Sequence, residues 1–200
     1  MSKTKLKEEP LSKREFILEE AAKLFVAKGY KATSMKDIAA TIGVEAASLY
    51  NHIKNKQEIL VVLLGGLADR FSIGIHEILI TNASSGEKLE EAIRMHIQVS
   101  LENRNKTHLI LEDWKHLEEP EYTRYLTLRK EYQDLFKGLV LEGIKSGFIK
   151  KGNPELILNN ILSSVRSIYN QYLYSNTSEV SKKEYEENII DFIFNGIGNK

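Results

Sequence analysis

Cysteine is absent from the 200 residues of this chain, and proline occurs only three times. Without cysteine the chain cannot form a disulfide scaffold, a cysteine-ligated zinc site or a cysteine nucleophile. No apolar run reaches the roughly 18 residues of a membrane span, and the lysine-rich N-terminal segment lacks the apolar region of a signal peptide. We therefore expect a soluble, cytoplasmic protein without membrane contacts.

The chain also has no net charge at pH 7, because 28 Lys and Arg residues balance 28 Asp and Glu residues. A neutral chain argues, by itself, against a nucleic-acid binder. The distribution is uneven, however: residues 1–60 hold 11 basic and 8 acidic side chains, and residues 61–200 hold 17 and 20. The sign of this asymmetry suits a DNA-contacting head on an acidic body, although three charges alone do not exclude random scatter.

Strand-like alternation and internal repeats are likewise absent. Apolar residues instead recur at helical spacing from Ile17 to Ile197. Together with the scarcity of proline, this periodicity predicts an all-α fold of about nine helices. We expect a flexible arm over residues 1–11, a DNA-binding domain over residues 12–58, and a helical ligand-binding and dimerisation domain over residues 59–200.

Residues 33–60 predict a helix-turn-helix, which places a short helix in the major groove of DNA. Ser34 and Asp37 have the spacing of a capping box at the start of one helix. Gly43 supplies a tight turn that needs a positive φ. A short helix is then expected over about residues 45–52, and Asn55 is placed to cap the long helix that follows.

The side chains around this motif predict two kinds of DNA contact. Base contacts are expected from Glu45, Ala46, Ala47 and Ser48, because alanine can meet a thymine methyl group and a glutamate can accept from a cytosine amino group. Phosphate contacts are expected from the hydroxyl, imidazole and ammonium groups of Thr33, Lys36, Ser48, Tyr50, His52 and Lys56. The alternative interpretation is that all of these are ordinary solvated residues.

Residues 14–60 resemble the N-terminal domain of the TetR family of transcriptional regulators. The resemblance rests on Ile17-Leu18, Ala21-Ala22, Leu24-Phe25, Gly29-Tyr30, Thr33-Ser34-Met35, Asp37-Ile38-Ala39, Gly43-Val44, Ser48-Leu49-Tyr50, His52, Asn55-Lys56 and Ile59-Leu60. It implies an all-helical homodimer, usually a repressor that a small molecule releases from DNA. It also implies phosphate contacts at Thr33, Lys36, Tyr50, His52 and Lys56. Two positions depart from the family pattern: Glu45 replaces a common Ser or Thr cap, and Ile53 replaces a common Phe.

The body resembles the subgroup of this family that answers to fatty acids or acyl-CoA thioesters. The resemblance rests on Glu131-Tyr132, Leu135-Phe136, Glu142-Gly143-Ile144, Gly147-Phe148-Ile149 and the segment 168–172. Taken singly, each of these residues is also explained by core packing or helix capping. The resemblance implies a small apolar or amphipathic effector, with a fatty acyl-CoA as first candidate. A pocket for it is expected among Leu67, Phe71, His96, Trp114 and Phe136.

The last two expected helices, over residues 154–174 and 181–198, carry wide apolar stripes. Two such helices from each subunit would form a four-helix bundle, so we expect a homodimer. Two glycines, Gly65 and Gly66, interrupt the long helix at a cost of about 1 kcal/mol each relative to alanine. Close packing or a bend would account for them, and packing is favoured.

No phosphate loop, nucleophile motif or ordered pair of carboxylates is present, so we expect neither an enzyme nor a bound cofactor. A helix is expected over residues 106–117, and within it His108 and His116 flank Glu112 at helical spacing. A fourth metal ligand is missing, so an exposed surface explains these residues better than a metal site. The predicted function is a ligand-responsive DNA-binding regulator of a palindromic operator. The alternative is a nucleoid-associated or division factor that uses the same fold without a small-molecule effector.

Overall fold

The computed structural model describes residues 11–174 and 181–198, and their side chains except those of residues 167–174 and Lys182. Within these ranges the backbone forms nine α-helices and one 3-10 helix, without a strand. The predicted all-α fold is thereby confirmed. The elements are α1 (Lys13–Lys28), α2 (Met35–Thr41), α3 (Ala46–Tyr50), α4 (Lys56–Leu79), α5 (Ser85–Glu102), α6 (Arg104–Glu112), η1 (Trp114–His116), α7 (Glu121–Lys145), α8 (Pro154–Tyr174) and α9 (Lys182–Ile197). The predicted arm lies outside the described residues, except for Leu11.

Local capping signals explain why the first three helices begin and end where they do. Ser12 starts α1 with a capping box, and Ser34 and Asp37 form the predicted box at the start of α2. Gly29 and Gly43 follow α1 and α2 with φ values of 89° and 70°, a region that glycine enters without a steric penalty. Helix α3 covers residues 46–50 and is shorter than predicted.

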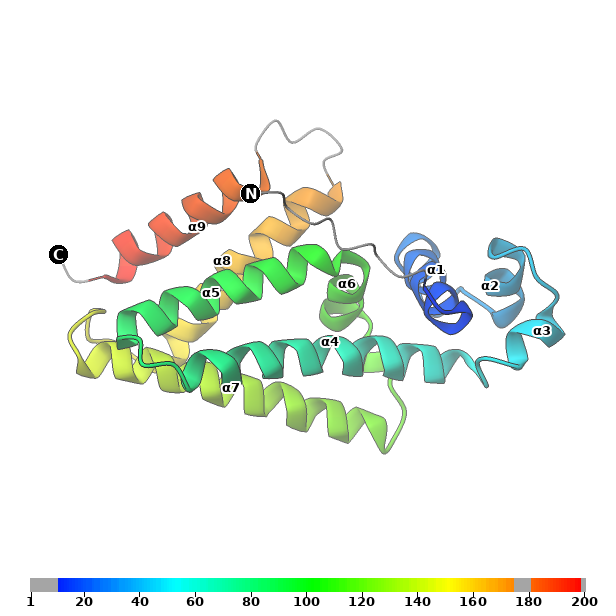
Figure 1. The fold of residues 1–200 in the computed structure, drawn as a ribbon, viewed down its shortest axis with the longest axis horizontal. Helices are drawn as coiled ribbons and strands as arrows, with labels where there is room; N and C mark the ends of the chain where they lie inside the picture. Colours follow the sequence, from blue (N-terminus) through cyan, green and yellow to red (C-terminus); the bar gives the residue numbers. More distant parts are fainter. Residues whose placement is uncertain (1–10, 175–180, 199–200) are drawn as a thin grey trace, which may run out of the picture.

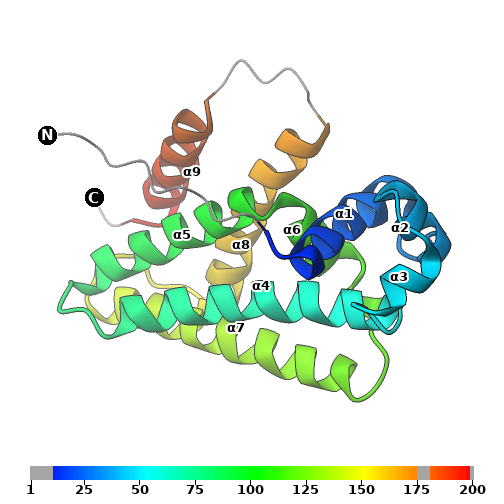
Figure 2. The ribbon, with the colours of Figure 1, turned by 45° about the vertical axis from the view of Figure 1, so that its right-hand side comes forward.

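The helices form a head and a body that share one long helix. In Figures 1 and 2 the head, α1 to α3, lies at one end of the molecule, and α4 runs from it along the length of the body. Helices α5 and α7 pack against α4, while α8 packs against α5 and α7, and α9 packs against α8 and α5. Helix α6 lies between head and body, because it contacts α1 and α4 as well as α5.

Two apolar cores hold this arrangement together. The body core joins α5 and α7 to α8 and α9, with the far half of α4. The head core joins α1, α2 and α3 to the first half of α4, and it also contains Leu109, Leu117 and Tyr125. These three side chains come from α6, the end of η1 and α7. The head therefore does not complete its own core, and the body supplies part of it.

By length and composition alone, α4 could cross a membrane. Its buried residues show a different role: Ile59, Leu60, Leu63 and Leu64 belong to the head core, whereas Ile75 and Ile78 belong to the body core. Helix α4 is thus the central core helix of the fold.

Two sequence predictions about helices need correction. A helix was expected over residues 106–117, but α6 ends at Glu112 and the short η1 follows it. The break occurs at Asp113, whose side chain turns inward and is only 9% exposed. The second correction concerns Gly65 and Gly66, because a Cβ atom added to either would meet nothing within 4 Å. Close packing therefore does not explain these glycines.

Gly65→Ala and Gly66→Ala are each expected to raise the free energy of unfolding by up to about 1 kcal/mol, because alanine loses less backbone entropy in a helix. For a chain of this size, that gain corresponds to a rise of roughly 2–4 °C in the thermal midpoint. Calorimetry of the purified variants would measure it.

Gly43→Ala is the control for this pair. A Cβ there also meets open space, but φ is +70°, so alanine would be strained by about 1–2 kcal/mol. If Gly65→Ala and Gly66→Ala lowered the thermal midpoint as much as Gly43→Ala does, this result would contradict the open space beside Gly65 and Gly66. Other atoms would then have to occupy that space in the functional protein.

Candidate nucleic-acid interface and ligand cavity

Helix α3 is anchored to the head from one side only. Leu49 and Ile53 are almost completely buried in the head core, and the Val44 amide donates to the Ala39 carbonyl across the turn at 3.0 Å. Ile53 therefore serves as a core residue in place of the Phe that is common in the family pattern. Glu45 occupies the N-cap position of α3 without a capping hydrogen bond from its side chain, which leaves its carboxylate in solvent.

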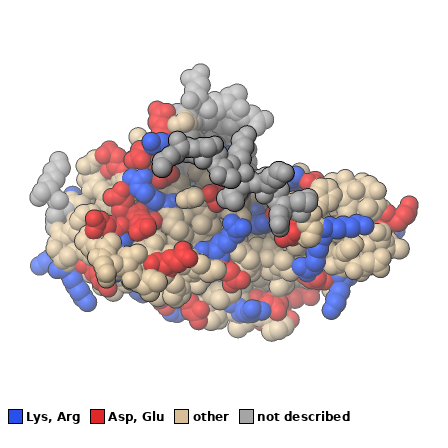
Figure 3. All heavy atoms as spheres, viewed as in Figure 1, with Lys and Arg blue, Asp and Glu red and all other residues tan. Residues whose placement is uncertain are grey.

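Most of the predicted DNA contacts lie on the accessible side of α2 and α3. Ala46, Ser48 and His52 are half-buried. Basic side chains project from the head at the right of Figure 3, where acidic side chains also occur, and side chains of both signs are spread over the body. The exposed members of the predicted set are Lys36, Glu45, Ala47 and Tyr50, and the tyrosine is 53% exposed. Their role in DNA binding stays a prediction.

Thr33 does not lie where a phosphate contact requires it. Its side chain is 2% exposed, and its hydroxyl donates to the Gly29 carbonyl at 2.8 Å. A buried hydroxyl that already has a partner closes the loop between α1 and α2, and it cannot reach a phosphate in this arrangement. The structure therefore assigns Thr33 to the architecture of this loop.

Lys56 is also turned inward. Its ammonium donates to the carbonyls of Tyr30 at 2.7 Å and of Thr33 at 2.8 Å, and it lies 4.3 Å from the centre of the Tyr30 ring. Partial burial lowers the pKa of this ammonium. Lys56 thus ties the loop between α1 and α2 to the start of α4, instead of presenting a free charge to DNA.

The two histidines predicted to be on an exposed surface meet instead at the junction of head and body. Nε2 of His108 and Nε2 of His116 lie 3.9 Å and 3.7 Å from the Asp113 carboxylate. The His116 ring stacks on Tyr30 with centroids 5.5 Å apart, and the Gln57 amide donates to the His116 carbonyl at 2.5 Å. Burial raises the pKa of Asp113 and lowers that of His116. Glu112 remains exposed and outside this group.

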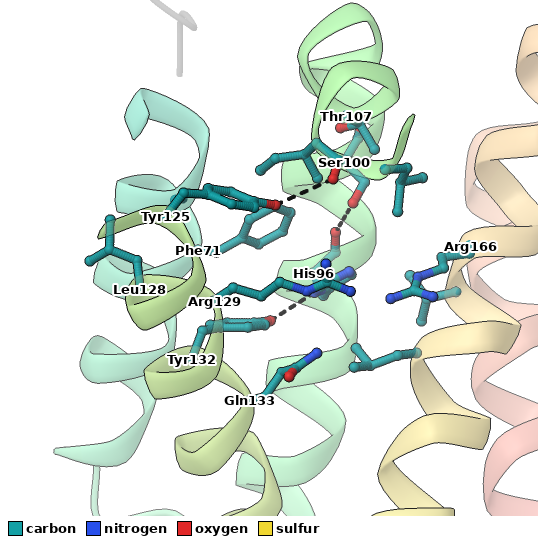
Figure 4. Close-up of a pocket in the computed structure, with 15 residues that line it drawn as sticks. Phe71, His96, Ser100, Thr107, Tyr125, Leu128, Arg129, Tyr132, Gln133 and Arg166 are labelled. Atoms are coloured by element: carbon teal, nitrogen blue, oxygen red, sulfur yellow. Dashed lines mark hydrogen bonds between the residues drawn. The ribbon is translucent and has the colours of Figure 1, made fainter. Parts of the chain in front are cut away.

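A cavity of about 130 Å³ lies in the body, enclosed by side chains from α4 to α8 (Figure 4). Two of the five predicted lining residues, Phe71 and His96, form part of its wall. Leu67 and Phe136 are fully buried in the packing behind it. Trp114 packs against Tyr122 and Tyr125 instead. The wall consists of Ala68, Phe71, His96, Ser100, Thr107, Ile110, Leu111, Tyr125, Leu128, Arg129, Tyr132, Gln133, Leu162, Val165 and Arg166.

One wall of the cavity is aromatic and uncharged. The His96 ring lies against Phe71, with centroids 4.6 Å apart, and its Nδ1 is 2.7 Å from the Tyr132 hydroxyl. Burial, reinforced by the positive charge of Arg166, lowers the pKa of His96 to about 3. Burial also raises the pKa of Tyr132. At neutral pH both side chains are therefore neutral, and they offer hydrogen bonds without charge.

Two arginines face this aromatic wall. Arg129 enters from α7 and Arg166 from α8, as Figure 4 shows. None of the described residues that line the cavity is acidic. A sequence signal for Arg129 does exist. Arg129 follows Leu128 within the apolar stripe from Tyr125 to Tyr132, where a charged side chain is unexpected. Arg166 likewise follows Val165 in the stripe of α8.

Comparison with known proteins relates both halves of the chain to one group. The family described as bacterial regulatory proteins, tetR family, matches residues 17–63. The description tetracyclin repressor-like, C-terminal domain, applies to the match over residues 82–197.

Individual relatives match most of the chain. The transcriptional repressor KstR2 of Mycolicibacterium smegmatis is 29% identical over 160 residues, which are 79% of this chain and 76% of the relative. The fatty acid metabolism regulator protein of Bacillus subtilis is 23% identical over 92% of this chain and 95% of its own. The structure of AibR in complex with isovaleryl coenzyme A and operator DNA superimposes with a TM-score of 0.80, at 23% identity, over 92% of this chain and 98% of the other.

The different settings of Lys36 and Lys56 lead to a prediction. Lys36→Ala should weaken binding to all DNA sequences and lower the salt slope by about one, without moving the thermal midpoint, because its ammonium is exposed. Lys56→Ala should weaken binding and also destabilise the fold by about 1–2 kcal/mol, since two carbonyls lose a charged donor.

Mobility-shift titrations at several salt concentrations, combined with calorimetry, would separate the two effects. A Lys56→Ala protein with an unchanged midpoint and a reduced salt slope would instead make Lys56 a direct phosphate contact.

Proposed function

The chain belongs to the TetR family of transcriptional regulators, and from this premise we propose that it is a cytoplasmic repressor released from a palindromic operator by a small effector. The effector would be apolar or amphipathic, with a fatty acyl-CoA as first candidate. The observation that carries this proposal is a cavity whose walls are also part of the head core. The relatives named as a KstR2 repressor and as a fatty acid metabolism regulator support it, as does the neighbour bound to isovaleryl coenzyme A.

In the proposed complex α3 lies in the major groove. Ala47 and Glu45 would meet base edges together with Ala46 and Ser48, while Lys36, Tyr50 and His52 would contact phosphates. Such a helix-turn-helix reads one half-site, so a palindrome requires two copies about one helical turn apart. We propose that residues 12–58 form the DNA-binding domain and residues 59–200 the regulatory domain. In this division only the head contacts the operator bases.

The second copy would associate through the last two helices. Phe192 on α9 is 67% exposed and Leu156 on α8 is 61% exposed, so each of these helices presents a large apolar side chain to solvent in the single chain. Burying such side chains favours association. Two helices from each subunit would then pack as a four-helix bundle at the dimer axis.

Coupling between the cavity and the head would run through shared side chains. Tyr125 lines the cavity and is buried in the head core, and its hydroxyl donates to the carbonyl of Ile110, another lining residue, at 3.3 Å. An occupant that displaces these walls would therefore change the packing under the head. Release requires that the effector bind the DNA-incompetent arrangement better, and a hundredfold preference corresponds to roughly 2.7 kcal/mol.

Phe192→Glu is expected to convert the dimer into a folded monomer, because a charge on the buried bundle face opposes association without disturbing the core of the single chain. Ile80→Glu is the matched control, since Ile80 is 84% exposed at the C-cap of α4 and belongs to neither α8 nor α9. Sedimentation velocity at micromolar concentration gives the answer. A monomeric unmodified protein, or a Phe192→Glu protein that stays dimeric, would contradict the proposed interface.

Acyl-CoA thioesters from butyryl-CoA to palmitoyl-CoA should be titrated against the protein–operator complex. At least one chain length is expected to free the DNA and to change the fluorescence of Trp114 over the same concentration range, because Trp114 packs on Tyr125 at the cavity wall. Free coenzyme A serves as the control. If no thioester bound the protein or released the operator, the acyl-CoA assignment would be wrong, and a constitutive DNA-marking factor would become the better description.

A further inference from the structure

The cavity holds more positive charge than its own residues neutralise. Arg129 and Arg166 line it from two different helices, and among the described residues neither forms a salt bridge with an Asp or Glu side chain. Arg94 in the same body shows the contrast: its guanidinium lies 2.8–3.1 Å from the carboxylates of Glu90, Glu186 and Glu187. Arg94 is thus neutralised by carboxylates, whereas the described part of the chain offers no carboxylate partner to the two arginines at the cavity.

The position of each guanidinium is set by its surroundings. The Arg129 side chain lies over the Trp114 ring, with Cζ 5.4 Å from the ring centre, so it is held against a rigid aromatic surface. Arg166 is more exposed than the half-buried Arg129, which places Arg166 at the rim of the cavity. Figure 4 shows both side chains extending toward the same space from opposite sides.

Electrostatics adds a second, independent indication. Partial burial of the guanidinium and the nearby charge of Arg129 both lower the pKa of Arg166, which means that the surroundings of Arg166 disfavour its charged form. Among the facing titratable groups only Tyr125 raises the pKa of Arg166, and its effect is outweighed; His96 and Tyr132 are neutral at physiological pH. An anion placed between the two guanidiniums would relieve the repulsion and regain charge-assisted hydrogen bonds.

We propose that Arg129 and Arg166 form a clamp for an anionic oxygen group of the effector, so that the effector is an acidic amphiphile and not a neutral apolar molecule. The inference rests on the proposed function and names the chemistry of its ligand. Guanidinium groups bind carboxylates and phosphates in a bidentate manner. The Gln133 amide, one turn beyond Arg129, would add a further donor, and Phe71 and Leu128 would contact the apolar part of the ligand.

Two ligand chemistries share this requirement, namely a carboxylate attached directly to the apolar group and the phosphates of an acyl-CoA. Three probes of equal chain length distinguish them from each other and from a neutral ligand: dodecanoate, dodecanoyl-CoA and dodecanol. Binding to the intact dimer would be measured by Trp114 fluorescence and by calorimetry, and release of a labelled operator would be measured in parallel.

Arg129→Gln and Arg166→Gln should each weaken binding of the anionic probe by at least about tenfold and leave dodecanol binding unchanged or tighter. Arg124→Gln is the matched control, since Arg124 lies on the same helix but pairs with Glu121 at 3.6 Å outside this cavity. Removing an uncompensated charge should not lower the thermal midpoint of either cavity variant, so a loss of binding would not reflect unfolding.

Each outcome decides between the alternatives. Loss of dodecanoate binding in both variants would support the clamp with a carboxylate, and loss confined to dodecanoyl-CoA would support it with phosphates. The clamp would be overturned if dodecanol bound the unmodified protein as tightly as either anion. It would also be overturned if both variants bound all probes as the unmodified protein does, even if the operator were released. Arginine-dependent binding that leaves the operator bound would sustain the clamp and overturn the proposed function. Failure of all three probes to bind would overturn the clamp, and the titration with the other acyl-CoA chain lengths would then decide on the proposed function.

Discussion

The structure depends on the way the body completes the core of the head. Leu109, Leu117 and Tyr125 belong to the body by their place in the chain, yet they are buried among the side chains of α1 to α4. Each such side chain contributes about 1.5–3 kcal/mol when it is fully buried, so the head cannot separate from α6 and α7 without a large loss of stability. The position of the reading helix is therefore fixed by the same helices that enclose the cavity.

A polar layer reinforces this apolar contact. Lys56 holds the loop after α1 through two carbonyls, the Tyr30 ring contacts both Lys56 and His116, and His116 in turn lies beside Asp113. Lys106 on α6 pairs with Glu19 on α1 at 2.5 Å. These contacts join α6 and η1 to the head, and Ile110, on the same α6, lines the cavity. A movement of α6 at the cavity wall would thus be transmitted to the loop before α2 through a continuous series of neighbouring contacts.

The parts of this fold that follow local rules could be predicted from the sequence. Ser34, Gly43 and Asn55 act through neighbours in the chain, so the helix-turn-helix was predictable almost to the residue. The inward roles of Thr33 and Lys56 were not, because their partners are backbone carbonyls whose direction depends on how α1, α2 and α4 pack. The meeting of the two cavity arginines depends on how α7 and α8 pack together, which local sequence patterns do not determine. An arginine within an apolar stripe was nevertheless a usable signal.

In the proposed mechanism, the junction of head and body carries the coupling between the cavity and DNA. The direct measurement is the ratio of operator dissociation constants with and without saturating dodecanoyl-CoA, in the unmodified protein and in His116→Ala. We expect the variant to keep its affinity for the operator and its affinity for dodecanoyl-CoA, each measured alone, within about threefold. The ratio should fall toward one, because the Tyr30–His116 stack is lost. A ratio in His116→Ala equal to that of the unmodified protein would contradict this mechanism.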